Sequence, residues 1–155
     1  MSEADQSRYY SQWYYACIHV LISIPLFQTI EAISQYLKLS RETVSEVLDF
    51  LEKCGLAKQH NPGFFEIGPQ HIHLGQDSAN IQKHHTNWRL KTLQSLDRLN
   101  KRDLHYSVVF TLSENDAQKI KGRLIEMIEE TMEKVRNSPE EVLYCHTIDF
   151  FQIES

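Results

Sequence analysis

The chain has 155 residues, a hydrophobic content of 41% and a formal net charge of −5. This length suits one domain or two small ones, and the composition supports a packed core, which excludes a disordered chain. The longest apolar stretch, Ile18 to Phe27, is interrupted by polar residues and falls short of the roughly 20 residues of a membrane span. The first ten residues lack the features of a secretory signal. We therefore expect a cytoplasmic protein without membrane contact.

Cysteine and histidine usage predicts neither a disulfide framework nor a metal site. The three cysteines are far apart and lack CxxC spacing: Cys17, Cys54 and Cys145. The pairs His71-x-His73 and His84-His85 are not followed by a third ligand at a recognised spacing. No nucleophile elbow, phosphate loop or dinucleotide fingerprint is present. We predict a protein without metal or cofactor that is not an enzyme.

The N-terminal segment predicts one core-facing helix over residues 9–21. Five aromatic side chains between residues 9 and 15 are more than one helical stripe accommodates. Some of them must therefore meet another surface, either a later helix of the same chain or a second subunit. The first interpretation is favoured because aromatic rings dominate ordinary cores.

Two short helices and a hairpin are predicted next. Thr29 is a candidate N-cap for a helix with apolar residues at helical spacing, and Ser40 can cap another that ends at Cys54-Gly55. Gly55 is the expected left-handed stop. A turn at residues 60–63 separates two short β-prone runs, which indicates a strand, turn, strand hairpin.

The C-terminal part predicts a long helix over residues 78–100 and then a strand-helix-strand unit. The buried stripe expected for the long helix comprises Ile81, His85, Trp88, Leu93, Leu96 and Leu99. Residues 105–112 and 142–153 are rich in β-formers, and Ser113 with Asp116 opens the helix between them. The predicted fold class is α+β, with segments 1–77, 78–104 and 105–155; the last is a small α/β dimerisation or sensing unit.

The run TIEAISQYLKLSRETVSEVL at residues 29–48, followed by LEKCGL at residues 51–56, resembles the winged helix-turn-helix of bacterial transcription regulators such as the MarR family. The whole chain, with YYSQWYY at 9–15, VVFTLS at 108–113 and IDFF at 148–151, also resembles an uncharacterised bacterial family of winged-helix proteins, in which it forms the C-terminal domain. Longer members carry about another domain's worth of sequence before it. These resemblances imply a winged helix-turn-helix over residues 27–75 and a regulatory role.

In such a fold the second helix reads base edges in the major groove, while flanking basic groups contact phosphates. The candidate DNA-binding residues are Ser40, Arg41, Glu42, Thr43, Ser45, Glu46, Lys58, His60 and Asn61. Between Arg41 and Lys53 there are two basic and four acidic residues, which counts against DNA because carboxylates near phosphate remove the gain from counterion release. Regulators with this pattern usually carry a basic or amide residue where this chain has Glu46.

A second electrostatic feature follows the hairpin. Residues 78–104 carry six basic side chains, which form a candidate patch for an anion or a partner: Lys83, Arg89, Lys91, Arg98, Lys101 and Arg102. Residues 114–155 hold ten acidic and five basic side chains, so this part repels phosphate. A solvated helix face is the favoured interpretation of the basic residues, but the complementary charges make a homodimer plausible.

Two functional hypotheses follow. The first is a homodimeric winged-helix transcription regulator that binds double-stranded DNA through the helix at residues 40–51. The second is a protein-interaction adaptor or signalling module that uses the same scaffold, has lost DNA binding, and contacts a protein partner through its aromatic N-terminal helix. Salt-sensitive binding that needs Arg41 and Lys58 favours the first, and dependence on Trp13 favours the second.

Overall fold

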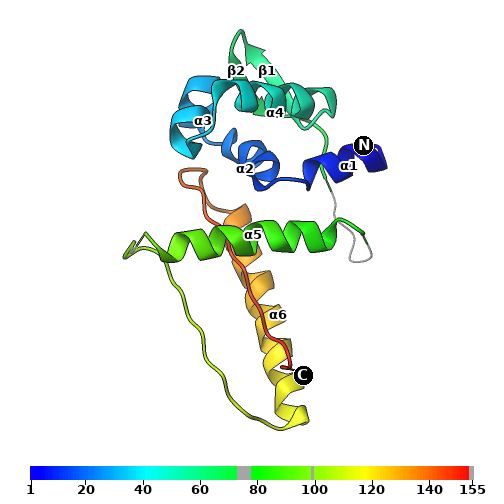
Figure 1. Cartoon of the computed structure of the whole chain (residues 1–155), viewed down its shortest axis with the longest axis vertical. Coiled ribbons are helices and arrows are strands. Elements are labelled where there is room, and N and C mark those ends of the chain that lie inside the picture. Colours follow the sequence, from blue (N-terminus) through cyan, green and yellow to red (C-terminus); the bar gives the residue numbers. More distant parts are fainter. Residues whose placement is uncertain (73–77, 99, 154–155) are drawn as a thin grey trace.

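The computed structural model describes residues 1–72, 78–98 and 100–153. Its elements, in chain order, are α1 (Glu3–Tyr9), α2 (Trp13–Leu21), the 3-10 helix η1 (Pro25–Phe27), α3 (Ile30–Leu37), α4 (Arg41–Lys53), β1 (Ala57–Asn61), β2 (Phe64–Ile67), α5 (Ile81–Leu96) and α6 (Glu114–Arg136). Residues 1–72, the N-terminal unit, gather α1 to α4 with the hairpin, α5 lies across one side, and α6 extends away (Figure 1). Helices with a small antiparallel sheet make the class α+β.

The N-terminal segment forms two helices, so the prediction of one helix over residues 9–21 is wrong. Tyr9 and Tyr10 are both buried, with 3% and 4% of their surfaces exposed. The two side chains meet different partners, since the Tyr9 hydroxyl bonds to His19 of α2 and the Tyr10 ring contacts His84 of α5. The chain instead ends α1 at Tyr9 and restarts at Trp13 after an extended Gln12.

Local capping determines where α3 and α4 begin and end, as the sequence predicts. Thr29 Oγ1 accepts a hydrogen bond from the Ala32 amide at 3.2 Å, and Ser40 Oγ accepts one from the Thr43 amide at 3.0 Å. Lys38 adopts a left-handed conformation with φ of 55°, and this turn joins the two helices. Gly55 has φ of 71°, which confirms the left-handed stop after α4.

The hairpin lies beside α4 (Figure 1), as predicted from the turn at residues 60–63. Its strands pair with Lys58 opposite Glu66, and a bulge lies between Gln59 and Asn61. Gly63 in the turn has φ of 83°, a conformation that favours glycine. The strand end is fixed to the helix end because the Gly68 amide donates to the Leu56 carbonyl at 2.8 Å.

Among the described residues, the buried side chains of the hydrophobic core all lie in the N-terminal unit, and Leu143 of the C-terminal part packs against them. The fully buried side chains are Ile18, Leu21, Ile22, Ile33, Val44, Val47, Leu48, Leu51 and Leu56. The aromatic residues of α2 join this core, since Tyr15 packs edge-on against Phe50 at 5.3 Å between ring centroids. Tyr10 similarly contacts His84 of α5. This confirms that the N-terminal aromatic side chains pack against later helices of the same chain.

The α5 helix is shorter than the helix predicted over residues 78–100. The described side chains predicted to form its buried stripe are not buried. Leu93 and Leu96 are 61% and 47% exposed, and Trp88 is only half-buried. Leu99, the last residue of that stripe, lies outside the described residues. Helical periodicity marks which side chains share a face, but burial requires another element to cover that face, and the described residues provide only partial cover.

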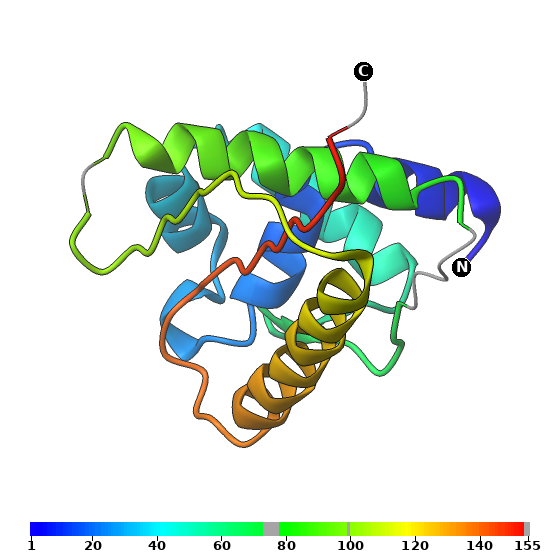
Figure 2. The same ribbon diagram turned by 90° about the horizontal axis from the view of Figure 1, so that it is seen from below.

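The predicted strand-helix-strand unit is only partly present. The helix is confirmed as α6, with Ser113 Oγ capping the Asp116 amide at 3.1 Å. Residues 105–112 and 142–153 are extended but form no paired strand in the described structure, so both strand predictions are wrong. A strand needs a hydrogen-bonding neighbour along its length. These segments approach each other at the stacked rings of Phe110 and Phe150, and in the view from below both cross in front of α5 (Figure 2).

Candidate nucleic-acid interface

The outer face of α4 is exposed because its inner face is fully used by the core. Val44, Val47 and Leu48 are buried, which leaves the opposite side of the helix to solvent. Four of the candidate DNA-binding residues in and before α4 are exposed: Ser40, Arg41, Glu42 and Glu46. Thr43 and Ser45 are half-buried. The structure therefore presents all six of these candidates on or near the same helix surface.

Arg41 already has a carboxylate partner. Its Nη1 lies 3.4 Å from Glu31 Oε1 of α3. The two side chains are 67% and 56% exposed, so water screens the pair and it contributes little to stability, on the order of 0–1 kcal/mol. A phosphate could therefore displace Glu31 from Arg41 at small cost.

The hairpin lysine is also neutralised within the chain. Lys58 Nζ lies 3.0 Å from Glu66 Oε1, and His60 Nδ1 lies 3.9 Å from the same oxygen. The hydrogen bond from Lys58 lowers the pKa of Glu66 below its ordinary value of 4.5. Asn61 is exposed at the end of β1. The hairpin thus brings Lys58, His60 and Asn61 together as candidates but shields the lysine with a carboxylate.

Sequence reasoning missed three residues at this surface. Glu31 and Glu66 neutralise the two main candidate cations, and Lys38 is an exposed cation in the turn between α3 and α4. Cross-strand pairing of Lys58 with Glu66 could have been inferred from the hairpin register. The contact between Glu31 and Arg41 depends on how α3 and α4 cross, which no local pattern reveals.

The six basic residues of 78–104 do not form one patch. Lys83 donates to Ser7 Oγ at 3.0 Å, Arg89 pairs with Asp149, and the Lys91 ammonium lies 3.9 Å from the centroid of the Trp13 ring. Burial lowers the pKa of Lys91. The remaining three are exposed around the end of α5: Arg98, Lys101 and Arg102. Half of the set therefore holds α5 against neighbouring segments, and half faces solvent.

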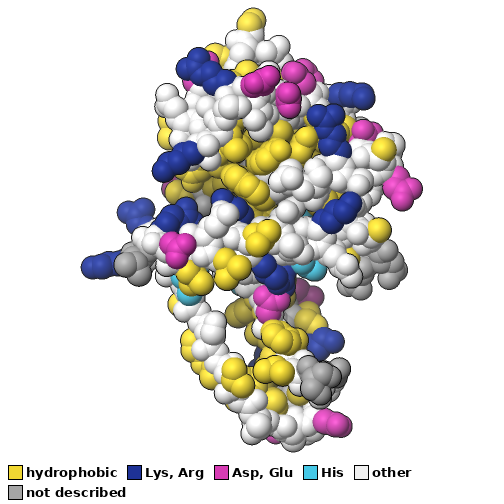
Figure 3. All heavy atoms as spheres, in the orientation of Figure 1, with side chains coloured by type: hydrophobic (Ala, Val, Ile, Leu, Met, Phe, Trp, Pro, Cys, Tyr) yellow, Lys and Arg dark blue, Asp and Glu magenta, His cyan; other side chains and the backbone are white. Residues whose placement is uncertain are grey.

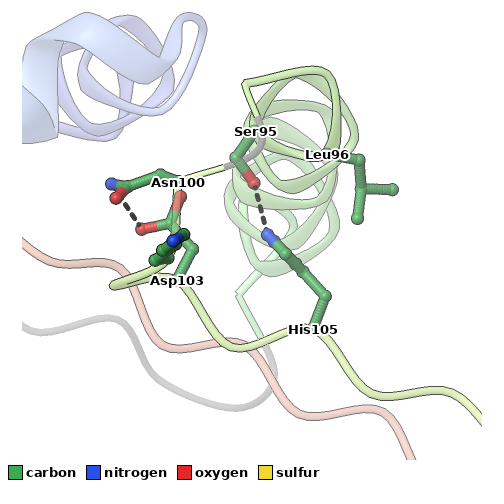
Figure 4. A pocket seen from close by; sticks show the side chains of 6 residues that line it. Ser95, Leu96, Asn100, Asp103 and His105 are labelled. Atoms are coloured by element: carbon green, nitrogen blue, oxygen red, sulfur yellow. Dashed lines mark hydrogen bonds between the residues drawn. The ribbon is translucent and has the colours of Figure 1, made fainter.

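A surface hollow of about 380 Å³ lies at the end of α5 (Figure 4). Ser95 and His105 face each other across it at 3.4 Å, and Asn100 donates to Asp103 at 3.1 Å. Its polar groups are thus bonded to one another, and the hollow is open to solvent. The Ser95 hydroxyl donates its proton to the Thr92 carbonyl at 2.7 Å rather than to His105.

Within residues 1–72, 78–98 and 100–153, no group of three histidine, cysteine or acidic side chains is arranged to hold a metal ion. His73 of the His71-x-His73 pair lies outside these residues. In the same part of the chain, no helix combines the length and apolarity required to cross a membrane.

His19 is a structural histidine of the N-terminal unit. Its Nδ1 and the Tyr9 hydroxyl lie 2.9 Å apart, in a hydrogen bond that ties α1 to α2. Burial lowers the pKa of His19 below its ordinary value of 6.5, and burial does the same to His84. Both side chains therefore favour the neutral form in the folded protein.

Lowering the pH from about 7.5 to about 5.5 should reduce the free energy of unfolding. Because burial lowers the folded-state pKa of His19, the unfolded chain binds protons in this window that the folded chain excludes. The free energy of unfolding is highest above the pKa that His19 has in the unfolded chain. It decreases as the pH falls from there toward the lower pKa of His19 in the folded protein. Urea unfolding at several pH values checks this, and His19→Gln should reduce the slope, with His84 providing the remainder. Equal slopes in the two proteins would contradict the assignment.

Residues 1–153 match the family described as "Domain of unknown function (DUF4423)", and the chain belongs to this family. No curated protein sequence and no solved structure shows significant similarity to it.

Proposed function

We propose that residues 27–75 form a winged helix-turn-helix and that the chain is a DNA-binding transcription regulator acting as a homodimer. The described residues of this segment supply two short helices joined by a turn and followed by a hairpin beside the second helix. In this proposal α4 reads the major groove, the hairpin contacts the backbone, and the protein is not an enzyme. The observation that carries it is the exposed first half of α4, capped by Ser40 and anchored from behind by the core.

The charge distribution predicts weak, salt-dependent binding. On the face shown in Figure 3, basic and acidic side chains are interspersed over the N-terminal unit rather than forming one positive field. Phosphates must displace Glu31 from Arg41 and Glu66 from Lys58. Exposed ion pairs each cost on the order of 1 kcal/mol or less to break, so binding is reduced but not prevented.

A second candidate function is an adaptor that binds a protein rather than DNA. The observation that favours it is the acidic outer face of α4, which carries Glu42, Glu46, Asp49 and Glu52, all exposed. The sequence-based version of this hypothesis used the aromatic N-terminal helix as the contact. That surface is largely occupied, because Tyr15 is buried and Trp13 lies under Lys91. The adaptor would therefore use α4 instead.

A fluorescence-anisotropy titration against random duplex DNA and the gene's own upstream sequences tests the proposal. With about two phosphates contacted per subunit, the affinity of a dimer should fall roughly 100-fold between about 50 mM and about 200 mM salt. Arg41→Ala should weaken binding and lower the salt slope by about one unit per subunit. Glu66→Gln should strengthen binding about threefold to tenfold, because it frees Lys58 from a competing carboxylate.

Lys53→Ala is the matched control for Arg41→Ala, since it removes one exposed cation from the other end of α4. It should leave the affinity within about twofold of the wild-type value. Absence of binding at low salt, in both the wild-type protein and Glu66→Gln, would reject the DNA proposal and favour the adaptor. Loss of binding in Glu46→Lys to a protein partner would then support the acidic face as the contact.

A further inference from the structure

The part of the chain after residue 103 lacks a core of its own. We call residues 104–153 the C-terminal arm. None of the described residues after Asn80 is buried, and 16 of the 24 large hydrophobic side chains that are exposed lie in the arm. Figure 3 shows these apolar side chains along the arm, with an opening between its extended segment and α6. Contiguous apolar exposure on this scale marks a surface that another molecule covers.

The helix α6 shows this most clearly. Four of its side chains at helical spacing are 40–57% exposed: Ile125, Ile128, Met132 and Val135. They form one apolar face along the second half of a 23-residue helix, none of which is buried. Such a face stabilises a helix only when it packs against another element.

The arm also has unpaired backbone. Residues 104–112 and 142–153 are extended and rich in β-formers, yet neither takes part in the described sheet. Extended segments with free amide and carbonyl groups are templates for pairing with another chain. The stacked rings of Phe110 and Phe150 place the two segments of one chain close together at one point, where a shared sheet could begin.

The accessible surface is large enough for an extensive dimer interface. The chain exposes 11954 Å² at a mass of 18.2 kDa. A compact monomer of this mass exposes about 8,100 Å², so the excess is about 3,800 Å² per chain. Obligate dimers bury about 2,000–5,000 Å² in total over both partners, a range that the excess surface of two chains covers.

The charges indicate that the missing partner is the same protein. Arg98, Lys101 and Arg102 are exposed beside the start of the arm and form no ion pair within the described residues. The arm carries exposed carboxylates along and after α6 that form no ion pair with any other described residue, including Glu129, Glu133 and Glu140. One chain thus presents both a basic patch and an acidic patch that complement each other in charge. A two-fold dimer brings each patch against its complement on the other copy, whereas an unrelated partner would need to match both.

We propose that the C-terminal arm is completed by the arm of a second copy of this chain. The two extended segments of each copy join a sheet shared between subunits, and the apolar faces of the two α6 helices cover that sheet. This deepens the homodimer in the proposed function by locating its interface, and it does not depend on DNA. The alternative occupant, a different protein, is rejected or favoured by the same experiment.

Size-exclusion chromatography with light scattering tests the partner. At about 50 µM chain, a dimer with Kd near 1 µM or lower is almost fully formed, so the mass should be twice 18.2 kDa. Val109→Arg should yield a monomer whose helical content is retained, because this side chain is 82% exposed in the single chain. The matched control is Leu26→Arg, at a site that is 79% exposed in the N-terminal unit and should remain dimeric.

Amide hydrogen exchange tests the shared sheet. Amides of residues 104–112 and 142–153 should exchange at least about tenfold more slowly in the wild-type dimer than in Val109→Arg. A monomeric wild-type protein, or a dimer that persists in Val109→Arg without protection of these amides, would overturn the proposal. Because no DNA is present, the result is separate from the DNA test. A dimer that binds no DNA rejects only the regulator, and a DNA-binding monomer rejects only this interface.

Discussion

Replacing Gly68 with alanine should destabilise the N-terminal unit by about 3 kcal/mol or prevent its folding. A Cβ at this position would overlap the carbonyl group of Gly55, and the nearby atoms of Leu56 are also backbone. Rigid backbone cannot move aside as a flexible side chain can, so the hairpin would have to separate from the end of α4. The Gly68 amide would then lose its hydrogen bond to the Leu56 carbonyl. Chemical denaturation followed by circular dichroism measures the change.

Gly122→Ala is the matched control for this substitution. Gly122 lies inside α6, and a Cβ there would meet no atom within 4 Å. Alanine loses less conformational entropy than glycine in a helix, so this variant should be as stable as the wild-type protein or more stable by about 0.5–1 kcal/mol. A Gly68→Ala protein with the wild-type denaturation midpoint would contradict the described contact between hairpin and helix end.

Replacing Leu48 with alanine should cost about 3 kcal/mol of stability. Leu48 is on the inner face of α4 and is fully buried in the core. Its truncation removes apolar contacts and leaves a cavity that packed neighbours fill only in part. The same loss should weaken any binding that depends on the orientation of α4, because the core holds this helix in place. Guanidinium unfolding of the two proteins provides the measurement.

The control for Leu48→Ala is Leu93→Ala in α5, where the side chain is 61% exposed. This change should alter stability by less than about 0.5 kcal/mol. If the two variants lost equal stability, the core would not be confined to the N-terminal unit. If Leu93→Ala lost an intermediate amount of stability, and did so only at high protein concentration, a second copy of the chain would cover α5.

The sequence predicts the parts of the fold that depend on neighbouring residues. Thr29 and Ser40 cap their helices as expected, Gly55 takes the left-handed conformation, and the turn before Phe64 closes the hairpin. These features are local, because each cap or turn is decided within about four residues of the chain. The same reasoning locates the α6 start at Ser113.

The errors arise where structure depends on distant contacts. The residues at 105–112 and 142–153 have β-forming side chains, but forming a strand requires a partner that the described single chain does not supply. The aromatic run could not reveal that the chain breaks between Tyr9 and Trp13, where the two rings before the break meet α2 and α5. At the candidate DNA surface, the residues are exposed as predicted, yet the carboxylates that neutralise Arg41 and Lys58 come from other elements.

The position of the core along the chain has a consequence for synthesis in the cell. All 16 buried residues of the core cluster lie between Tyr9 and Phe65. The N-terminal unit can therefore fold on the ribosome while the second half of the chain is still being translated, as domains generally do. The apolar arm emerges after these residues. Neighbouring nascent chains on one messenger RNA therefore encounter each other with their N-terminal units already folded, which limits mispairing between unfolded N-terminal units.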